Sequence, residues 1–180
     1  MDATRLRATY LTGETIYLRA PVKADAGHAA AWLEDTFPIN TPRAEALLEE
    51  EFANPSWEAI PIRLVIVRSD GDRIVGGALL RGGRHDWRLA LTLTVAPWEE
   101  EPDRVRADAL RLLVPWVRDD LEAMTLALEI GVDQPRTIAV AEELGMERTA
   151  VLREWLLRPG GRVAAACYQA LFQPWVVRDA

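Results

Sequence analysis

The sequence has few side chains that could act as nucleophiles or metal ligands. One cysteine and two histidines occur among its 180 residues, so an internal disulfide is excluded. Cys167 lies in the apolar run 163–167, where a buried thiol behaves as a small hydrophobic group. Neither His28 nor His85 lies in a recognisable motif, so we predict neither a catalytic cysteine nor a metal site.

Long apolar runs are also missing. No stretch approaches the roughly 20 residues that a helix needs to cross a bilayer. The first residues, Met1 to Arg5, lack the charged and then apolar layout of a signal peptide. We therefore predict a cytoplasmic protein without a membrane partner.

Positive charge is scarce, and lysine is nearly absent. The 21 basic residues face 28 acidic ones, which gives a formal net charge of -7 and an isoelectric point near 5.0. This balance disfavours nucleic acid as a partner, because binding to a phosphate backbone requires a concentrated basic surface. Lys23 is the single lysine, so almost every cation is a planar, permanently charged guanidinium.

The remaining composition is that of an ordinary globular domain. Hydrophobic residues make up 49% of the chain and charged residues 27%, which argues against long disordered segments. The length allows one sizeable core but not two. We predict a single domain over residues 1–180, with its core at about 13–175.

Apolar periodicity predicts the elements of the first half. Thr41 is expected to cap the second helix, with Pro42 at its first helical position. The predicted elements are a strand at 15–20, helices at 23–35 and 42–52, and strands at 62–68, 73–80 and 87–95.

The second half predicts a strand–helix–strand–helix passage. Pro115 is expected to kink or break the long helix, Asp133 to cap the next helix, and Gly145 to end it. The predicted elements are a helix at 103–121, a strand at 125–131, a helix at 134–144, and strands at 148–157 and 163–172. The fold class is α/β (α+β), with about four helices flanking a mixed, mainly antiparallel sheet of about seven strands and one locally parallel step.

Three local strings give this order of elements a family likeness. They are Gly13-Glu14-Thr15-Ile16-Tyr17-Leu18-Arg19, Asp133-Gln134-Pro135-Arg136-Thr137 leading to Ala141-Glu142-Glu143-Leu144-Gly145-Met146, and Cys167-Tyr168-Gln169-Ala170-Leu171. Together with the order of elements, they resemble the GNAT acetyltransferase superfamily, and within it the branch similar to the RimJ/RimL protein N-terminal acetyltransferases. The middle string is the most specific, although its end alone is also an ordinary helix C-terminus.

The resemblance implies acetyl-CoA as co-substrate and a cleft between two strands. The pantetheine arm would lie near Leu93 and Val95, opposite the strand 126–130, with Gln134 also at the cofactor. Thr137 would protonate the departing thiolate, and Glu129 would act as general base through a water. The alternatives from the residues alone are a capping or packing role for Thr137 and a solvated strand position for Glu129. Tyr168 matches a family tyrosine, or fills the core.

The phosphate loop departs from the family pattern. The resemblance implies a glycine-rich turn that opens the long helix and binds the pyrophosphate through backbone N–H groups, and this places cofactor contacts at Arg104, Val105, Arg106 and Ala107. The stretch Trp98 to Arg104 contains no glycine, and Pro102 lacks an N–H group. Its acidic residues would repel a diphosphate unless they point away. Arg104 and Arg106 could clamp the phosphates instead, or solvate the helix start.

Two functions are consistent with these observations. The first is an N-acetyltransferase that transfers an acetyl group directly from acetyl-CoA to a primary amine, on a protein N-terminus or a small molecule. The second is a GNAT-fold binding or regulatory protein that no longer uses acetyl-CoA. Trp57 and Trp98 are candidates for a substrate groove or a dimer contact, and Trp175 is compatible with a homodimer.

Overall fold

A computed structural model describes residues 11–33, 39–53, 61–82, 88–158 and 160–172. The side chains of residues 51–53 and all other residues lie outside this description. Three residues named above, Trp57, His85 and Trp175, therefore lie outside the described residues, and so does Pro159.

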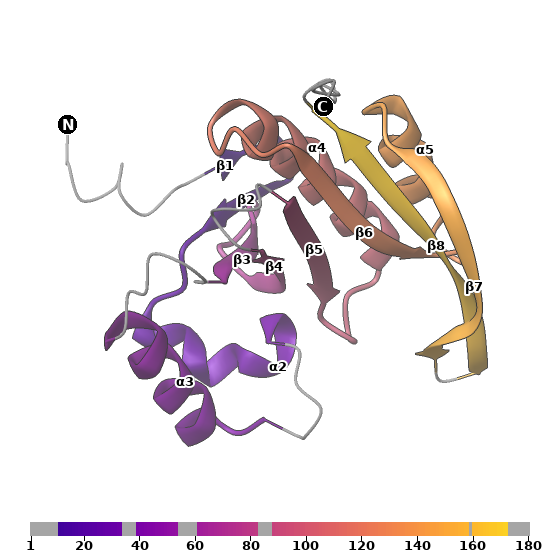
Figure 1. The fold of residues 1–180 in the computed structure, drawn as a ribbon. Helices are drawn as coiled ribbons and strands as arrows, with labels where there is room; N and C mark the ends of the chain where they lie inside the picture. Colours follow the sequence, from indigo (N-terminus) through magenta and orange to yellow (C-terminus); the bar gives the residue numbers. More distant parts are fainter. Residues whose placement is uncertain (1–10, 34–38, 54–60, 83–87, 159, 173–180) are drawn as a thin grey trace.

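The described strands form one eight-stranded sheet (Figure 1). Seven of them agree with the predicted strands to within two residues at each end, and the eighth, β1, is a two-residue strand that pairs with β2. The strands are β1 (Leu11–Thr12), β2 (Ile16–Arg19), β3 (Ile62–Arg68), β4 (Ile74–Arg81), β5 (Arg88–Val95), β6 (Thr125–Gly131), β7 (Glu147–Arg158) and β8 (Gly161–Leu171).

The spatial order of the strands is β1-β2-β3-β4-β5-β6-β8-β7. All neighbours pair antiparallel except β5 and β6, which are parallel. The predicted mixed sheet with one parallel step is therefore confirmed. The chain between β5 and β6 supplies the crossover helix that a parallel connection requires.

The described helices lie on both faces of the sheet. They are the 3-10 helix η1 (Lys23–His28) and the α-helices α2 (Ala29–Trp32), α3 (Thr41–Ala53), α4 (Pro102–Asp119) and α5 (Pro135–Glu143). The strand β3 shows how one sheet serves two cores, because Leu64 and Ile66 pack with α4 while Val65 and Val67 pack with η1, α2 and α3. This alternation follows from the two-residue period of a strand.

Two predictions about the helices differ from the structure. Pro115 lies inside α4, which is one continuous helix, so the predicted break is wrong. Thr41 is already helical, and the Asn40 side-chain carbonyl accepts a hydrogen bond from the Arg43 N–H at 3.0 Å. Asn40 therefore supplies the capping contact that was predicted for Thr41.

A glycine in β4 lets α2 approach the sheet closely. A Cβ atom at Gly77 would collide with the carbonyl oxygen of Trp32, the last residue of α2. Trp32 is itself buried, and its indole N–H donates to the Asp25 carbonyl at 2.9 Å. No helix in the described part of the chain is long and apolar enough to cross a membrane.

Candidate functional site

The two parallel strands separate before they end. Pairing between β5 and β6 covers four residues on each strand and stops at Leu91 and Leu128. Beyond these residues β5 continues to Val95 and β6 to Gly131. Within the described strands, the peptide groups of β5 that face β6 beyond Leu91 therefore have no strand partner, which leaves them available to a ligand.

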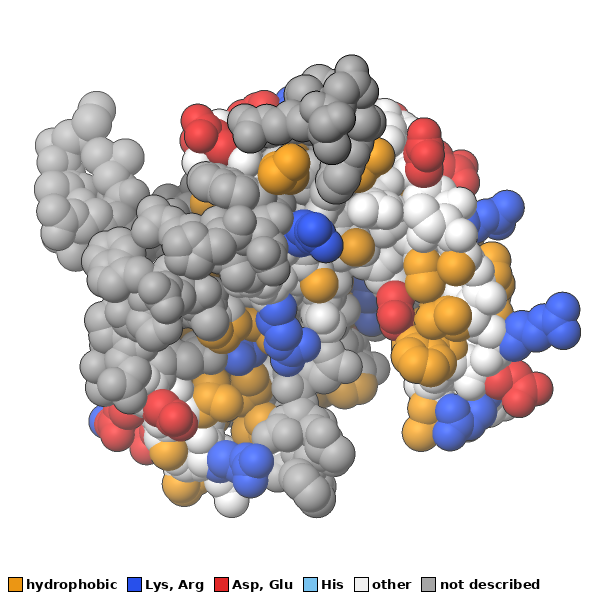
Figure 2. All heavy atoms as spheres, in the orientation of Figure 1, with side chains coloured by type: hydrophobic (Ala, Val, Ile, Leu, Met, Phe, Trp, Pro, Cys, Tyr) orange, Lys and Arg blue, Asp and Glu red, His pale blue; other side chains and the backbone are white. Residues whose placement is uncertain are grey.

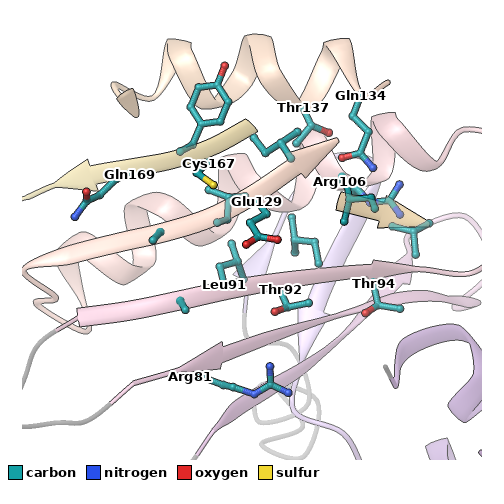
Figure 3. Close-up of a pocket in the computed structure, with 18 of the residues that line it drawn as sticks. Arg81, Leu91, Thr92, Thr94, Arg106, Glu129, Gln134, Thr137, Cys167 and Gln169 are labelled. Carbon is teal, nitrogen blue, oxygen red and sulfur yellow. The ribbon is translucent and has the colours of Figure 1, made fainter. Parts of the chain in front are cut away.

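A cavity of about 920 Å³ opens at this separation. Side chains of β4, β5, β6, β7 and β8 line it, together with Arg106 of α4, Thr137 of α5 and Gln134, which directly precedes α5. Figure 3 shows Glu129 of β6 pointing into the gap above β5, with Arg81 of β4 on the opposite side. A volume of this size is in the range of small-molecule and cofactor sites.

Glu129 is exposed in the cavity and is held by an indole group. Its Oε2 atom accepts a hydrogen bond of 2.6 Å from the Nε1–H of Trp155, a residue of β7 that is 54% exposed. Trp155 reaches this position from an irregular stretch of β7. Between Leu152 and Leu156, three residues of β7 lie opposite one residue of β8.

This bulge includes a residue in the left-handed backbone region. Glu154 has φ 49°, and its carbonyl accepts a hydrogen bond from Arg162 at 3.2 Å. A non-glycine residue is uncommon in this conformation, and bulges often direct a side chain beside a site. Here the bulge directs Trp155 toward Glu129.

Thr137 lies at the buried start of α5 and is bound to α4. Its hydroxyl donates to Asp103 Oδ1 at 2.6 Å, and its N–H donates to the same oxygen at 3.0 Å. The Arg136 N–H donates to Asp103 Oδ2 at 2.8 Å. Asp103 therefore caps α5 across space, whereas the predicted cap, Asp133, forms a salt bridge with Arg158 at 3.0 Å.

The acidic loop before α4 turns its charges away from the cavity or neutralises them. Glu99 is buried and lies 3.6 Å from Arg68 and 3.4 Å from Arg73. Glu101 binds Arg104 at 3.0 Å and Arg136 at 3.2 Å. The hydrogen bonds from these two arginines lower the pKa of Glu101. The condition that the acidic residues point away is thus met for Glu99.

Arg104 and Arg106 lie on different sides of α4. Arg104 approaches Glu101 at 3.0 Å and Asp108 at 3.9 Å and lines a second, smaller cavity of about 260 Å³ beside Gly13. Arg106 lines the main cavity, near Gln134 (Figure 3). A position on one helix face and a position two residues later cannot both face the same cleft.

The other predicted cofactor residues divide between cavity and core. Leu93 and Val95 line the cavity, and so does Gln134, whose Oε1 atom accepts from the Gly131 N–H at 3.2 Å. Val105 and Ala107 are buried in the core, with exposed fractions of 1% and 2%. Their side chains are therefore not available to a ligand in the cavity, although their peptide groups lie on α4.

Cys167 and Tyr168 are neighbours on β8 with different surroundings. Cys167 is half-buried and lines the cavity, so it is not the fully buried thiol that the sequence predicted. Tyr168 is 1% exposed, and its hydroxyl donates to Glu142 at 2.9 Å. Burial, followed by the Glu142 contact, raises the pKa of Tyr168.

The sequence did not indicate three residues of this region. Trp155 and Arg158 line or adjoin the cavity from β7, and Asp103 joins the two helices. Arg158 directly precedes the β7–β8 turn, and no local spacing identifies such a position. Trp98, by contrast, is 56% exposed and does not line the main cavity.

Comparison with solved structures gives clear similarities. A putative acetyltransferase from Sphaerobacter thermophilus DSM 20745 is 42% identical, with a TM-score of 0.73 over 92% of this chain and 97% of that one. A dodecameric spermidine N-acetyltransferase from Vibrio cholerae is 16% identical, with a TM-score of 0.67 over 93% and 100%. At this identity the second likeness concerns the fold alone.

A chimera of the Vibrio cholerae spermidine N-acetyltransferase and hSSAT also shares the fold. It is 18% identical, with a TM-score of 0.65 over 88% of this chain and 97% of the chimera. No protein-family model matches the sequence, and no curated protein matches it either.

Proposed function

Because this chain belongs to the GNAT acetyltransferase superfamily, we propose that it transfers an acetyl group from acetyl-CoA to a primary amine, on a protein N-terminus or a small molecule. We also propose membership of the branch similar to RimJ/RimL, a cytoplasmic location and a homodimer as the assembly to test.

The separation of β5 and β6 supports this proposal most. Pairing stops at Leu91 and Leu128, and the cavity begins there with Leu93, Val95 and Gln134 on its walls. An extended pantetheine arm carries amide groups, which can pair with the free peptide groups of β5 as a further strand would. Such pairing would align the thioester with the inner end of the cleft.

Direct transfer requires a proton acceptor. In the proposed reaction the amine nitrogen forms a bond to the thioester carbon, the carbon–sulfur bond breaks, and the sulfur leaves as a thiolate. Glu129 would accept the amine's proton through a water. This carboxylate is exposed in the cavity, and its position is fixed by the hydrogen bond from Trp155.

The thiolate must in turn receive a proton. Thr137 is our proposed donor, and it lines the same cavity. Its hydroxyl hydrogen points to Asp103 in the free protein, so the hydroxyl would rotate toward the sulfur. The proton that Glu129 accepted from the amine would then return to the Thr137 oxygen through water. Thr137→Ser would retain this role, whereas Thr137→Val would remove it together with the hydroxyl contact to Asp103 and leave the backbone contact in place.

A binding or regulatory protein without transfer activity is the second candidate. Pro102 supplies no N–H at the start of α4, and no glycine occurs from Trp98 to Arg104. Backbone recognition of a diphosphate at this helix start is therefore reduced. This observation favours a protein that does not bind acetyl-CoA, unless other groups bind its phosphates.

An acetylation assay separates the two candidates. Purified protein with acetyl-CoA is tested against N-terminal peptides, single amines and spermidine, and product is identified by mass spectrometry. Spermidine is included because a protein of the same fold acts on it, as its name states. Turnover with any acceptor supports the enzyme. No turnover and no acetyl-CoA binding would support the second candidate.

Variants then test the proposed base. Glu129→Gln should lower kcat/KM by about 100-fold or more, as is typical for loss of a general base. Glu147→Gln is the control, because Glu147 is exposed on β7 and does not line the cavity. Trp155→Phe, with Trp98→Phe as its control, should give a smaller loss, about tenfold for one hydrogen bond to a charged group. Equal activity of Glu129→Gln and wild type would disprove the assignment.

A further inference from the structure

Two arginines from different elements line the main cavity. Arg106 extends from α4 and Arg158 from the end of β7, and both belong to the cavity that also contains Gln134 and Thr137. Arg106, Gln134 and Thr137 lie beyond the separation of β5 and β6, near the starts of α4 and α5. Figure 3 shows Arg106 beside Gln134 at this end of the cleft.

The charged side chains that line the main cavity are three arginines, Arg81, Arg106 and Arg158, and one carboxylate, Glu129. Burial lowers the pKa of Arg106, and the charge of Arg158 lowers it further, against weaker attraction from Asp103 and Asp133. Among the described residues, Arg106 has no hydrogen bond or salt bridge. Asp133 already pairs with Arg158, so Arg106 is the guanidinium of this pair that an added anion would neutralise.

Part of the Arg158 guanidinium has no hydrogen-bond partner among the described residues. Its Nε–H group donates to Asp133 Oδ2 at 3.0 Å, which fixes the plane of the guanidinium. The terminal nitrogens make no hydrogen bond to the described residues. The side chain is 30% exposed and lines the main cavity.

A glycine makes room for this arrangement. A Cβ atom at Gly131, the last residue of β6, would lie 3.0 Å from Arg158 Nη2 and would collide with the Asp133 carboxylate. The missing side chain therefore allows Arg158 and Asp133 to cross the end of β6. A larger residue at this position would force the Asp133 carboxylate to move and would crowd the Arg158 guanidinium.

We propose that Arg106 and Arg158 together bind the diphosphate of acyl-CoA, in place of a glycine-rich backbone turn. The inference rests on the proposed function, because it assumes an acyl-CoA donor. Guanidinium forks match phosphate oxygens in pairs and form charge-assisted hydrogen bonds. The missing N–H group of Pro102 then lowers the affinity for the diphosphate only slightly, because side chains rather than the helix N–H groups bind the phosphates.

The proposed clamp uses Arg106 of α4 and not Arg104. Arg104 was a candidate for the same clamp, but its guanidinium is bound by Glu101 and lies within 3.9 Å of Asp108 on another side of the helix. Arg104 and Arg106 thus form a matched pair, on the same helix and two residues apart, of which one faces the main cavity.

Equilibrium binding of two donors tests the clamp. Calorimetry compares acetyl-CoA with acetyl-pantetheine, which has the thioester arm but no phosphate. Wild type should bind acetyl-CoA more tightly. Arg106→Gln and Arg158→Gln should each weaken acetyl-CoA by about tenfold or more, as expected for lost hydrogen bonds to a charged group. Neither substitution should change the affinity for acetyl-pantetheine, and Arg104→Gln should change neither affinity.

Further measurements separate a loss of acetyl-CoA binding from a loss of folding. Thermal unfolding of each variant confirms that it is folded, and Arg158→Lys retains the charge without the fork, so it should recover part of the affinity. The salt dependence of acetyl-CoA binding should be smaller in Arg106→Gln and Arg158→Gln than in wild type. Unchanged acetyl-CoA affinity in both variants would overturn the clamp, and so would equal losses in Arg104→Gln.

The clamp and the proposed function fail in different ways. Turnover with acetyl-CoA that is unaffected by either arginine substitution would remove the clamp and leave the enzyme. Binding of acetyl-pantetheine but not of acetyl-CoA would show that the cleft does not accept the phosphates, which also overturns the clamp. Binding of neither donor would reject both proposals.

Discussion

A single thiol reports on the charge inside the cleft. Cys167 is half-buried in the cavity wall. Burial raises its pKa, and the nearby carboxylate of Glu129 raises it further. A raised thiol pKa means less thiolate at a given pH, and the thiolate is the reactive form.

Alkylation kinetics check this at the residue scale. The rate of reaction of Cys167 with iodoacetamide should rise with pH along a curve whose midpoint lies at higher pH than in the urea-unfolded chain. Because Cys167 is the single cysteine, mass spectrometry of the intact protein follows it directly. The midpoint separates a pKa effect from limited access, which would lower the rate at every pH.

Removing the neighbouring charge supplies the control. Glu129→Gln should move the midpoint to lower pH, since the repulsion of the thiolate by the carboxylate is lost. Glu147→Gln should leave it unchanged. A midpoint in folded wild type equal to that of the unfolded chain would contradict the prediction.

At the scale of elements, α4 and α5 are joined by one carboxylate. Asp103 accepts the Arg136 and Thr137 N–H groups and the Thr137 hydroxyl. It satisfies free donors at the start of α5, as a local capping residue would, although it lies 34 residues earlier than Thr137. It also ties the start of α4 to the start of α5.

Asp103→Ala should destabilise the protein by about 1–2 kcal/mol, the usual cost of losing a helix cap. Asp103→Asn keeps one acceptor oxygen and should cost less. Urea unfolding followed by circular dichroism measures both, with Glu100→Ala as the control, because Glu100 is exposed in the same loop. A loss in Asp103→Ala no larger than in Glu100→Ala would show that the contact does not stabilise α5.

Sequence periodicity predicted the elements far better than the contacts between them. The bounds of β6 agree at both ends, because Leu126, Leu128 and Ile130 alternate clearly with outward residues. The two-residue β1 carries no pattern that could reveal it. The cap of α5 was assigned to Asp133 because sequence reasoning looks only at adjacent residues, whereas Asp103 reaches α5 through tertiary packing.

The same limit applies to the candidate site. Glu129, Thr137, Gln134 and Arg106 do line one cavity, and their roles there stay predictions. Arg158 was missed because its approach depends on the β7–β8 hairpin folding back along β6 and on the missing side chain at Gly131. Neither condition leaves a local signal in the sequence.

At the scale of the whole molecule, the sheet consists of two groups of strands that few residue pairs join. Strands β1 to β5 and strands β6 to β8 are hydrogen-bonded to each other through four residue pairs, from Arg88 with Thr125 to Leu91 with Leu128. Figure 1 shows β6, β8 and β7 diverging from β5. A ligand in the cleft would contact both halves and connect them.

Thermal unfolding should therefore respond to the donor. Acetyl-CoA at about 100 times its dissociation constant should add about 2.7 kcal/mol of stability. For a chain of this size that corresponds to a rise in Tm of about 5–10 °C. Differential scanning calorimetry measures the shift, and dependence on acetyl-CoA concentration is the control. A constant Tm up to millimolar acetyl-CoA would contradict a working cofactor site.

The bulge in β7 has a second consequence, at the outer border of the sheet. β7 is an outermost strand in the order of the sheet, and it exposes Val151, Trp155 and Leu157; Figure 2 shows hydrophobic side chains gathered on this hairpin. A long, flat, apolar edge invites pairing with another molecule and aggregation. The extra residues around Glu154 interrupt its regular row of peptide groups. The distortion that aims Trp155 at the cleft thus also makes this edge a less regular template for fibre-like pairing.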